Sequence, residues 1–218
     1  MNTILCSHFL FQSQTPCVNR HRYPHCGVDL CQHAIKIKEA IHLVRLGARA
    51  GLVCQLTGLD KAPINRLYRQ MLGTTSPPGQ MPFSDTWYRE SDLRMLQATF
   101  IWRLYRKLEN NGRSLAQVLI DVYEVYTGLV REPLLDFTRA VFATRLIAMD
   151  LWEERICSFC SHDFLDPVDS RRNTCPGCRL YLRYRCHQCG SPLNQQSKGR
   201  RRTQCNQCAN ASNGKAHQ

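Results

Sequence analysis

The chain has 218 residues, and its 29 basic and 17 acidic side chains give a formal net charge of +12 at neutral pH. This length admits one large domain or a helical domain with a smaller appendage. The charge favours a polyanionic partner such as nucleic acid, although a basic excess also serves ordinary solubility. No run of about 18 apolar residues occurs, so the sequence predicts neither a membrane-spanning helix nor a membrane partner. No signal-peptide pattern is seen either, so we expect a cytoplasmic protein whose 13 cysteines serve as metal ligands rather than as disulfides.

Residues 1–33 mix His, Cys, Pro and Asn and show no helical or strand period. We predict an N-terminal extension that is poorly ordered, or that results from a start site assigned too far upstream. The alternative is a metal site formed by His25, Cys26, Cys31 and His33, although their spacing matches no familiar ligand pattern.

Residues 34–156 are predicted to form an all-helical domain with its own core. Helical periodicity begins at residue 34, where Ile37, Ile41, Val44 and Ala48 fall on one face. Residues 73–87 contain three prolines and two glycines and predict a loop. Three more helices are expected over residues 86–109, 114–128 and 132–153, the last with Pro133 in its first turn. Their inward positions are predicted to be Leu93, Leu96, Phe100, Leu104 and Leu108, then Leu115, Val118, Leu119, Val122 and Val125, then Leu135, Ala140, Phe142, Leu146 and Met149.

Residues 50–69 fit the spacing of a helix-turn-helix. Such a unit needs apolar and small residues on the inner faces and a glycine at the turn, where Gly58 falls. The second helix would run from about Lys61 to Leu72 with Pro63 in its first turn. Its outward side chains, whose types suit base and phosphate contacts, would be Lys61, Asn65, Arg66 and Arg69. The alternative is two helices of a bundle with a solvated basic face.

Eight of the cysteines lie in residues 157–218 as four CxxC pairs, which marks a domain boundary near residue 156. CSFC and CPGC are separated by 14 residues, and after seven more residues CHQC and CNQC are separated by 15. Two such turns supply four thiolates to a tetrahedral zinc ion, so residues 157–210 are predicted to be a tandem zinc ribbon, followed by a flexible tail over 211–218. The predicted ligands of two zinc ions are Cys157, Cys160, Cys175, Cys178, Cys186, Cys189, Cys205 and Cys208. Sequential pairing is favoured because each half has a complete ribbon spacing, and interleaved pairing is the alternative.

Other uses of these cysteines fit less well. A redox CxxC normally stands alone beside a βαβ pattern, and a zinc deaminase needs a His-x-Glu segment that the chain lacks. With sulfur at every corner, neither ion has an open position for a catalytic water, and no nucleophile with a partner base is visible. We therefore predict structural metal sites and no enzyme.

The loop GSPLNQQSKGRRRTQ between the last two pairs carries Lys198, Arg200, Arg201 and Arg202. Residues 157–218 hold ten basic and three acidic side chains, and part of this excess compensates the charge of the thiolates. Four cations on one loop exceed that need, so we predict that the loop contacts phosphates.

The segments LGARAGLV, GLDKAPINRLYRQMLG and SPPGQMPFSDTW, followed by a four-cysteine segment, together resemble FlhC, the C subunit of the bacterial flagellar master transcriptional activator. The resemblance covers roughly residues 31–178. It implies a zinc site at Cys157, Cys160, Cys175 and Cys178, an FlhD-like partner in a heteromeric complex, promoter DNA as target and recruitment of RNA polymerase. The N-terminal extension and the second four-cysteine segment depart from the flagellar pattern. A regulator of conjugative transfer, for which FlhC-like subunits are also used, fits them at least as well.

Taken together, the sequence predicts a mainly α protein with a double zinc ribbon that acts as a DNA-binding subunit of a transcriptional activator. The alternative is a zinc-ribbon module that binds RNA or joins protein partners.

Overall fold

The computed structural model describes all residues except 1–27, 80, 110–111, 194–201 and 214–218. The described chain divides into two compact units. The helical unit comprises the described residues up to Asp85 together with Gln97–Leu146, and the cysteine-rich unit comprises Thr86–Leu96 and the described residues from Ile147 onward. The predicted combination of a helical part and a cysteine-rich C-terminal part is confirmed.

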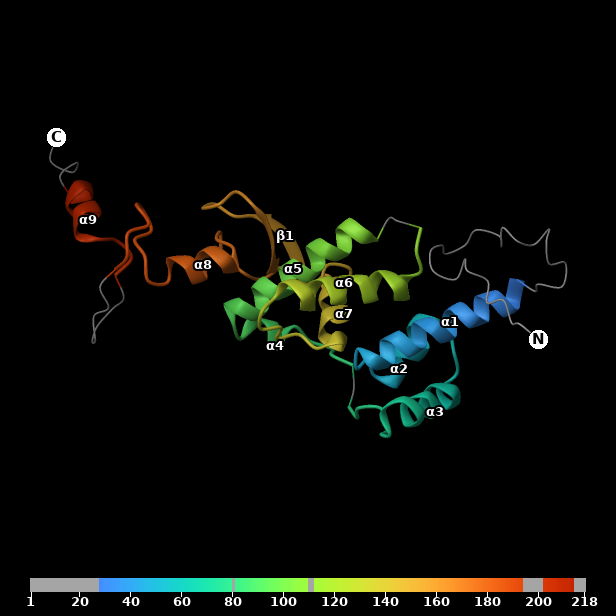
Figure 1. Ribbon diagram of the computed structural model, residues 1–218. Coiled ribbons are helices and arrows are strands. Elements are labelled where there is room, and N and C mark those ends of the chain that lie inside the picture. Colours follow the sequence, from blue (N-terminus) through green and yellow to red (C-terminus); the bar gives the residue numbers. More distant parts are fainter. Residues whose placement is uncertain (1–27, 80, 110–111, 194–201, 214–218) are drawn as a thin grey trace. The chain divides into compact units, whose positions relative to one another are not determined.

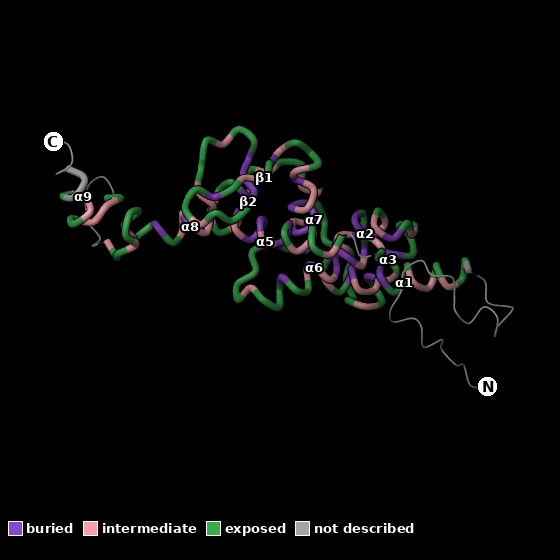
Figure 2. The backbone as a smooth tube through the Cα atoms, turned by 90° about the horizontal axis from the view of Figure 1, so that it is seen from above, coloured by how far each residue is buried: buried purple, intermediate pink, exposed green. Residues whose placement is uncertain are grey.

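The helical unit begins with three helices that pack on one another: α1 (Val28–Arg45), α2 (Ala50–Thr57) and α3 (Lys61–Leu72) (Figure 1). Their shared core contains Leu43, Val44, Leu52, Val53, Ile64 and Tyr68. Figure 2 shows buried positions along this part of the chain, whereas residues 202–210 near the C-terminus are exposed or intermediate. The predicted helix over Lys61–Leu72 is confirmed, as is the glycine turn before it, because Gly58 ends α2 in the left-handed region with φ 69°.

Two expectations for α1 are wrong. The helix begins at Val28 rather than at residue 34, so the last residues of the expected extension are helical. Ile37 is 40% exposed, because the packed stripe of α1 lies at Ala40, Leu43 and Val44, nearer its C-terminal end. Residues 1–27 of the extension lie outside the described residues.

The predicted loop after α3 folds back onto the start of α2. Arg49 is the N-cap of α2 and makes no capping hydrogen bond with its side chain. Ser76 supplies one instead, since its Oγ accepts a hydrogen bond from the backbone N–H of Ala50 at 2.8 Å. The loop therefore satisfies one of the unpaired donors at this helix end.

The helix expected over 86–109 is divided into α4 (Thr86–Arg89) and α5 (Asp92–Leu108). Its predicted inner stripe is also wrong, since Met95, Ala98, Ile101 and Trp102 are buried while Leu93 is 39% exposed. Apolar side chains surround most of α5, so helical period alone does not select the buried face.

Helix α6 (Leu115–Leu129) is confirmed, and the side chain of its N-cap Ser114 accepts from the Gln117 N–H at 3.1 Å. Val118, Leu119 and Val122 are buried as predicted, but Leu115 and Val125 are exposed. Ala116, Ile120 and Tyr126 take their places in the core, because α6 is buried on a broader arc than the predicted stripe.

The helix expected over 132–153 is shorter, and its end is not helical. Helix α7 runs only over Phe137–Arg145, because Asp136 caps it by accepting from the Arg139 N–H at 2.7 Å, which leaves Pro133 outside. Strand β1 (Trp152–Ile156) then pairs antiparallel with β2 (Asp163–Pro167). Met149 is 43% exposed and lies in the turns between the end of α7 and the start of β1.

The cysteine-rich unit contains this hairpin, α4 with the start of α5, α8 (Pro176–Leu182) and α9 (Asn206–Asn213). The buried ring of Tyr88 in α4 meets Trp152 of β1 edge-on, with centroids 6.1 Å apart. The boundary expected after residue 156 would divide the hairpin, so β1 folds with the cysteine pairs. Helix α9 extends into the segment expected to be a flexible tail, of which residues 214–218 lie outside the described residues.

Among the helices of the described residues, none is long and apolar enough to cross a membrane.

Replacing Gly58 by alanine is expected to lower the free energy of unfolding by about 1–2 kcal/mol, because a Cβ is strained at φ 69°. Gly51→Ala is the matched control: Gly51 lies inside α2 and a Cβ there meets no atom within 4 Å. That change should raise stability by about 0.5–1 kcal/mol. Denaturant unfolding followed by helical circular dichroism checks both. Equal effects of the two changes would show that the αL turn is not required.

Candidate metal centres

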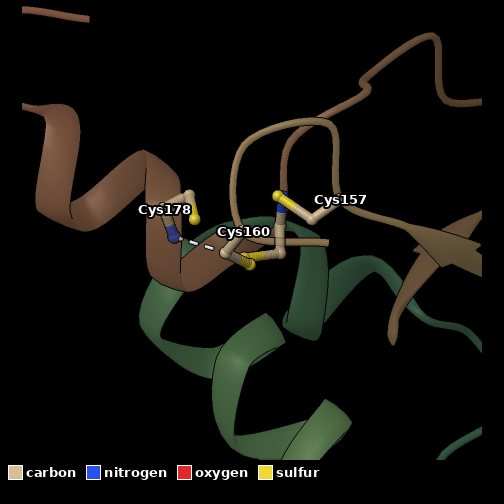
Figure 3. Close-up of side chains that lie close together, drawn as sticks. Cys157, Cys160 and Cys178 are labelled. Carbon is tan, nitrogen blue, oxygen red and sulfur yellow. Dashed lines mark hydrogen bonds between the residues drawn. The ribbon is translucent and has the colours of Figure 1, made fainter. Parts of the chain in front are cut away.

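The first cysteine cluster joins the turn of the β-hairpin to the start of α8. Cys157 and Cys160 lie in the turn between β1 and β2, and Cys175 and Cys178 lie at the N-terminus of α8, where Pro176 occupies the first turn. The four sulfurs all lie within 4.8 Å of one another. Figure 3 shows Cys157, Cys160 and Cys178 gathered where the hairpin turn meets the helix.

Backbone N–H groups surround these sulfurs. The Sγ of Cys157 accepts from the N–H groups of Phe159 at 3.4 Å and Cys175 at 3.2 Å, and the Sγ of Cys175 accepts from the Cys178 N–H at 3.3 Å. Burial by itself raises the pKa of Cys157, but the N–H donors of Cys175, Cys160 and Phe159 outweigh it and lower the pKa to about 6. The pKa of Cys178 is raised, by burial and by the neighbouring thiols. A cation is needed to hold all four as thiolates at neutral pH.

The geometry fits a tetrahedral ion. Thiolates about 2.3 Å from a zinc ion lie about 3.8 Å apart along a tetrahedral edge. Cys160 Sγ and Cys175 Sγ are 3.8 Å apart, and the corresponding distance between Cys189 and Cys205 is 3.6 Å. Both are far longer than the S–S bond of a disulfide, about 2.05 Å.

The first cluster is part of a small hydrophobic core. Cys157 and Cys178 are buried with Phe164 and Leu182. Arg179 attaches α8 to the first turn of α5, because its Nε donates to Asp92 Oδ1 at 2.7 Å and its guanidinium also donates to the Thr174 carbonyl. Gly177 lets the first turn of α8 lie close to α5, since a Cβ at this position would lie 3.5 Å from Leu96 Cδ1. Sequence spacing gave no signal for this contact with Thr86–Leu96.

The second cluster is built with fewer contacts. Cys186, Cys189, Cys205 and Cys208 also lie within 4.8 Å of one another, with Cys205 and Cys208 at the start of α9. Backbone N–H groups of Cys189 and Cys205 lower the pKa of Cys186 to about 6, whereas the thiols of Cys189 and Cys205 raise the pKa of Cys208 to about 12. Cys189 is exposed, and its Sγ lies 3.2 Å from the Ser191 hydroxyl, which lowers the pKa of Cys189.

The first two CxxC pairs therefore form one cluster and the last two form the other, as sequential pairing predicts. The interleaved alternative is not observed among these eight cysteines. Two groups of four sulfurs can hold two metal ions per chain. Cys31 lies in α1 together with His33, and neither belongs to these clusters. The other members of that expected alternative site, His25 and Cys26, lie outside the described residues.

The residues predicted to contact DNA lie in two places. On α3, Lys61, Arg66 and Arg69 are exposed and Asn65 is half-buried. In the second ribbon, Arg202 is exposed and donates to Asn206 Oδ1 at 3.0 Å. Lys198, Arg200 and Arg201 lie outside the described residues, so the described structure does not bring the predicted loop cations together.

Comparison with known proteins places the chain in a family of transcription regulators, which is not an enzyme class. The family model of the flagellar transcriptional activator FlhC matches residues 28–192. The flagellar transcriptional regulator FlhC of Enterobacter cloacae is 30% identical over 162 residues, covering 70% of this chain and 84% of the relative. FlhC of Variovorax paradoxus is 28% identical over 151 residues, covering 66% and 74%. FlhC of Paraburkholderia phymatum is 32% identical over 142 residues, covering 63% and 64%.

The chain therefore belongs to the FlhC family, as the sequence motifs predict. The match includes the whole first cluster but ends before Cys205 and Cys208, which complete the second cluster.

We expect the purified chain to contain two zinc ions, and a chelator to remove the ion of the second cluster first. Cys189 is exposed, whereas the first cluster is packed against Phe164 and Leu182. Metal analysis of Cys160→Ser and Cys189→Ser should each give one ion, with chelator-resistant metal only in Cys189→Ser. One ion in the unaltered chain would contradict the second site.

Proposed function

We propose that this chain is the DNA-binding subunit of a heteromeric transcriptional activator. It would act in the cytoplasm with an FlhD-like subunit, bind promoter duplexes and recruit RNA polymerase. Membership of a family of flagellar transcriptional activators supports this role. The single observation that carries DNA recognition is the exposed basic face of α3.

Helix α3 has the two faces that a DNA-reading helix needs. Ile64 and Tyr68 are 1% exposed and anchor it to α1 and α2. Lys61, Asn65 and Arg69 follow one another at intervals of four residues, with Arg66 beside them. Within the described residues, none of the three cations forms an ion pair. Arginine pairs with guanine and asparagine with adenine in the major groove, so this face could read bases.

The two cysteine clusters would each hold a structural zinc ion, whose bonds to four thiolates supply folding energy rather than catalysis. The first would fix α8 against the hairpin. The second would support the basic loop, in which Lys198, Arg200, Arg201 and Arg202 would contact phosphates without reading sequence.

Two target classes fit the chain. Flagellar promoters are suggested by the names of the relatives. Genes of conjugative transfer are the alternative, supported by the second cluster, which is completed beyond the part of the chain that the family model matches. A zinc-ribbon module that binds RNA or only joins protein partners remains the competing function.

We expect footprinting to show protection of the DNA upstream of this protein's own gene. The protection should appear only when an FlhD-like chain is co-expressed. Both subunits are needed because each would supply part of the DNA-binding surface. Protection should be lost with Lys61→Ala, Arg66→Ala and Arg69→Ala combined, while zinc content is unchanged. Equal affinity for random DNA and RNA would instead support the competing function.

The base-reading and phosphate-contacting residues are expected to respond differently to substitution. Arg66→Ala should relax discrimination between sites by about 1–3 kcal/mol per lost base contact. Replacing Arg200, Arg201 and Arg202 by alanine should weaken binding to all sequences alike and reduce the salt slope by about 3. Titrations of cognate and random duplexes at several salt concentrations separate these effects. Altered site preference in the loop variant would contradict this division of roles.

A further inference from the structure

The segment RLYLRYR, residues 179–185, joins the two cysteine clusters and exposes mainly arginine and tyrosine. Leu182 is 6% exposed and packs into the core of the first cluster. Tyr181 and Tyr184 are 51% and 48% exposed, and Arg183 between them is exposed. No site was predicted in this segment, although its alternation of arginine and tyrosine is visible in the sequence.

The segment is ordered by contacts with both clusters. The Arg185 guanidinium lies over the Tyr181 ring, 4.8 Å from its centroid, and donates to the Gly190 carbonyl at 3.1 Å. The Leu193 N–H donates to the Tyr184 carbonyl at 2.9 Å, and the Cys186 N–H donates to the Ser191 carbonyl at 2.8 Å. The two rings are thus presented on a backbone fixed before a ligand arrives, which lowers the entropy cost of binding.

The sequence around this segment is strongly basic, and a carboxylate that contacts it, Asp92, is paired with Arg179. Ten basic residues and no acidic residue follow Asp169 in the sequence. The nearest preceding carboxylates are already paired, Asp169 with Arg89 and the buried Asp166 with Arg155. The Arg183 guanidinium lies 5.8 Å from the Tyr184 ring centroid and forms no ion pair within the described part of the chain. A polyanion with flat apolar groups is the ligand that this combination complements.

We propose that Tyr181, Arg183, Tyr184 and Arg185 form a binding surface for single-stranded DNA, with bases stacked on the tyrosines and phosphates near the arginines. Base faces are accessible only in an unpaired strand, whereas in a duplex they are covered by stacking. This surface would therefore bind a different form of DNA from the duplex that we propose for the exposed face of α3. The choice of DNA over RNA rests on the proposed action at promoters, where strands separate when transcription starts.

The test measures binding of the full chain, with both metal sites filled, to a fluorescent single strand of about 12 nucleotides, within the usual site sizes of such proteins. The same sequence is offered as RNA and as duplex DNA. We expect the DNA single strand to bind most tightly. Tighter binding of RNA would overturn the assignment to DNA, and equal or tighter binding of the duplex would overturn the stacking surface.

Variants separate stacking from charge. Tyr184→Leu should weaken binding of the DNA strand about tenfold, while Tyr184→Phe, which keeps a ring, should bind like the unaltered chain. Arg183→Ala should weaken binding with a smaller salt slope, and Arg103→Ala, an exposed arginine of α5, should change nothing. Every variant must retain two metal ions. If Tyr184→Leu loses metal, Arg183→Ala provides the test alone, because its side chain makes no hydrogen bond in the described structure.

Equal affinity of Tyr184→Leu and Tyr184→Phe, or no effect of Arg183→Ala, would overturn the proposal. These measurements need neither the partner subunit nor a promoter. Their failure would leave the footprint test of α3 unaffected, so the two proposals can fail separately.

Discussion

The approach of four sulfur atoms to within 4.8 Å of one another is the constraint on which the cysteine-rich unit depends. Four thiolates at this separation repel one another unless a cation lies between them. The buried residues packed around the first cluster itself are few, namely Cys157, Phe164, Cys178 and Leu182, which is little apolar surface for holding this segment by burial alone. We therefore infer that metal binding and folding of the segments around the clusters are coupled.

The two clusters use the same ligands in different surroundings. The first is embedded between a hairpin, α8 and the start of α5, and Arg179 reaches Asp92 to fix that arrangement. The second rests on turns and on α9, and Cys189 is exposed. We infer that the first cluster organises the unit and that the second holds a basic surface in place. The family match ends at residue 192, before the second cluster is complete. This agrees with the second cluster being an addition to a framework that the chain shares with its family.

The helical unit shows where sequence period succeeds and where it does not. The α3 helix and its glycine turn were predictable because Gly58 takes the left-handed conformation that favours glycine and Ile64 lies on the buried face of the helix. The buried face of α5 was not, since apolar side chains occur around most of it and its neighbours select Met95 and Trp102. Similarly, the helical pattern through residues 146–153 was overridden, because Trp152 pairs opposite Pro167 in the hairpin.

The sequence by itself determined the helical character, the two sets of four ligands and the family, because each depends on residues that are close together in the chain or on fixed spacings. Only the tertiary structure decided that Thr86–Leu96 joins the cysteine-rich unit, and that Tyr181 and Tyr184 stand exposed beside arginines. Those features depend on contacts between residues as distant in sequence as Asp92 and Arg179. Such contacts form when apolar surfaces and charges find partners in the folded chain, and no local pattern encodes them.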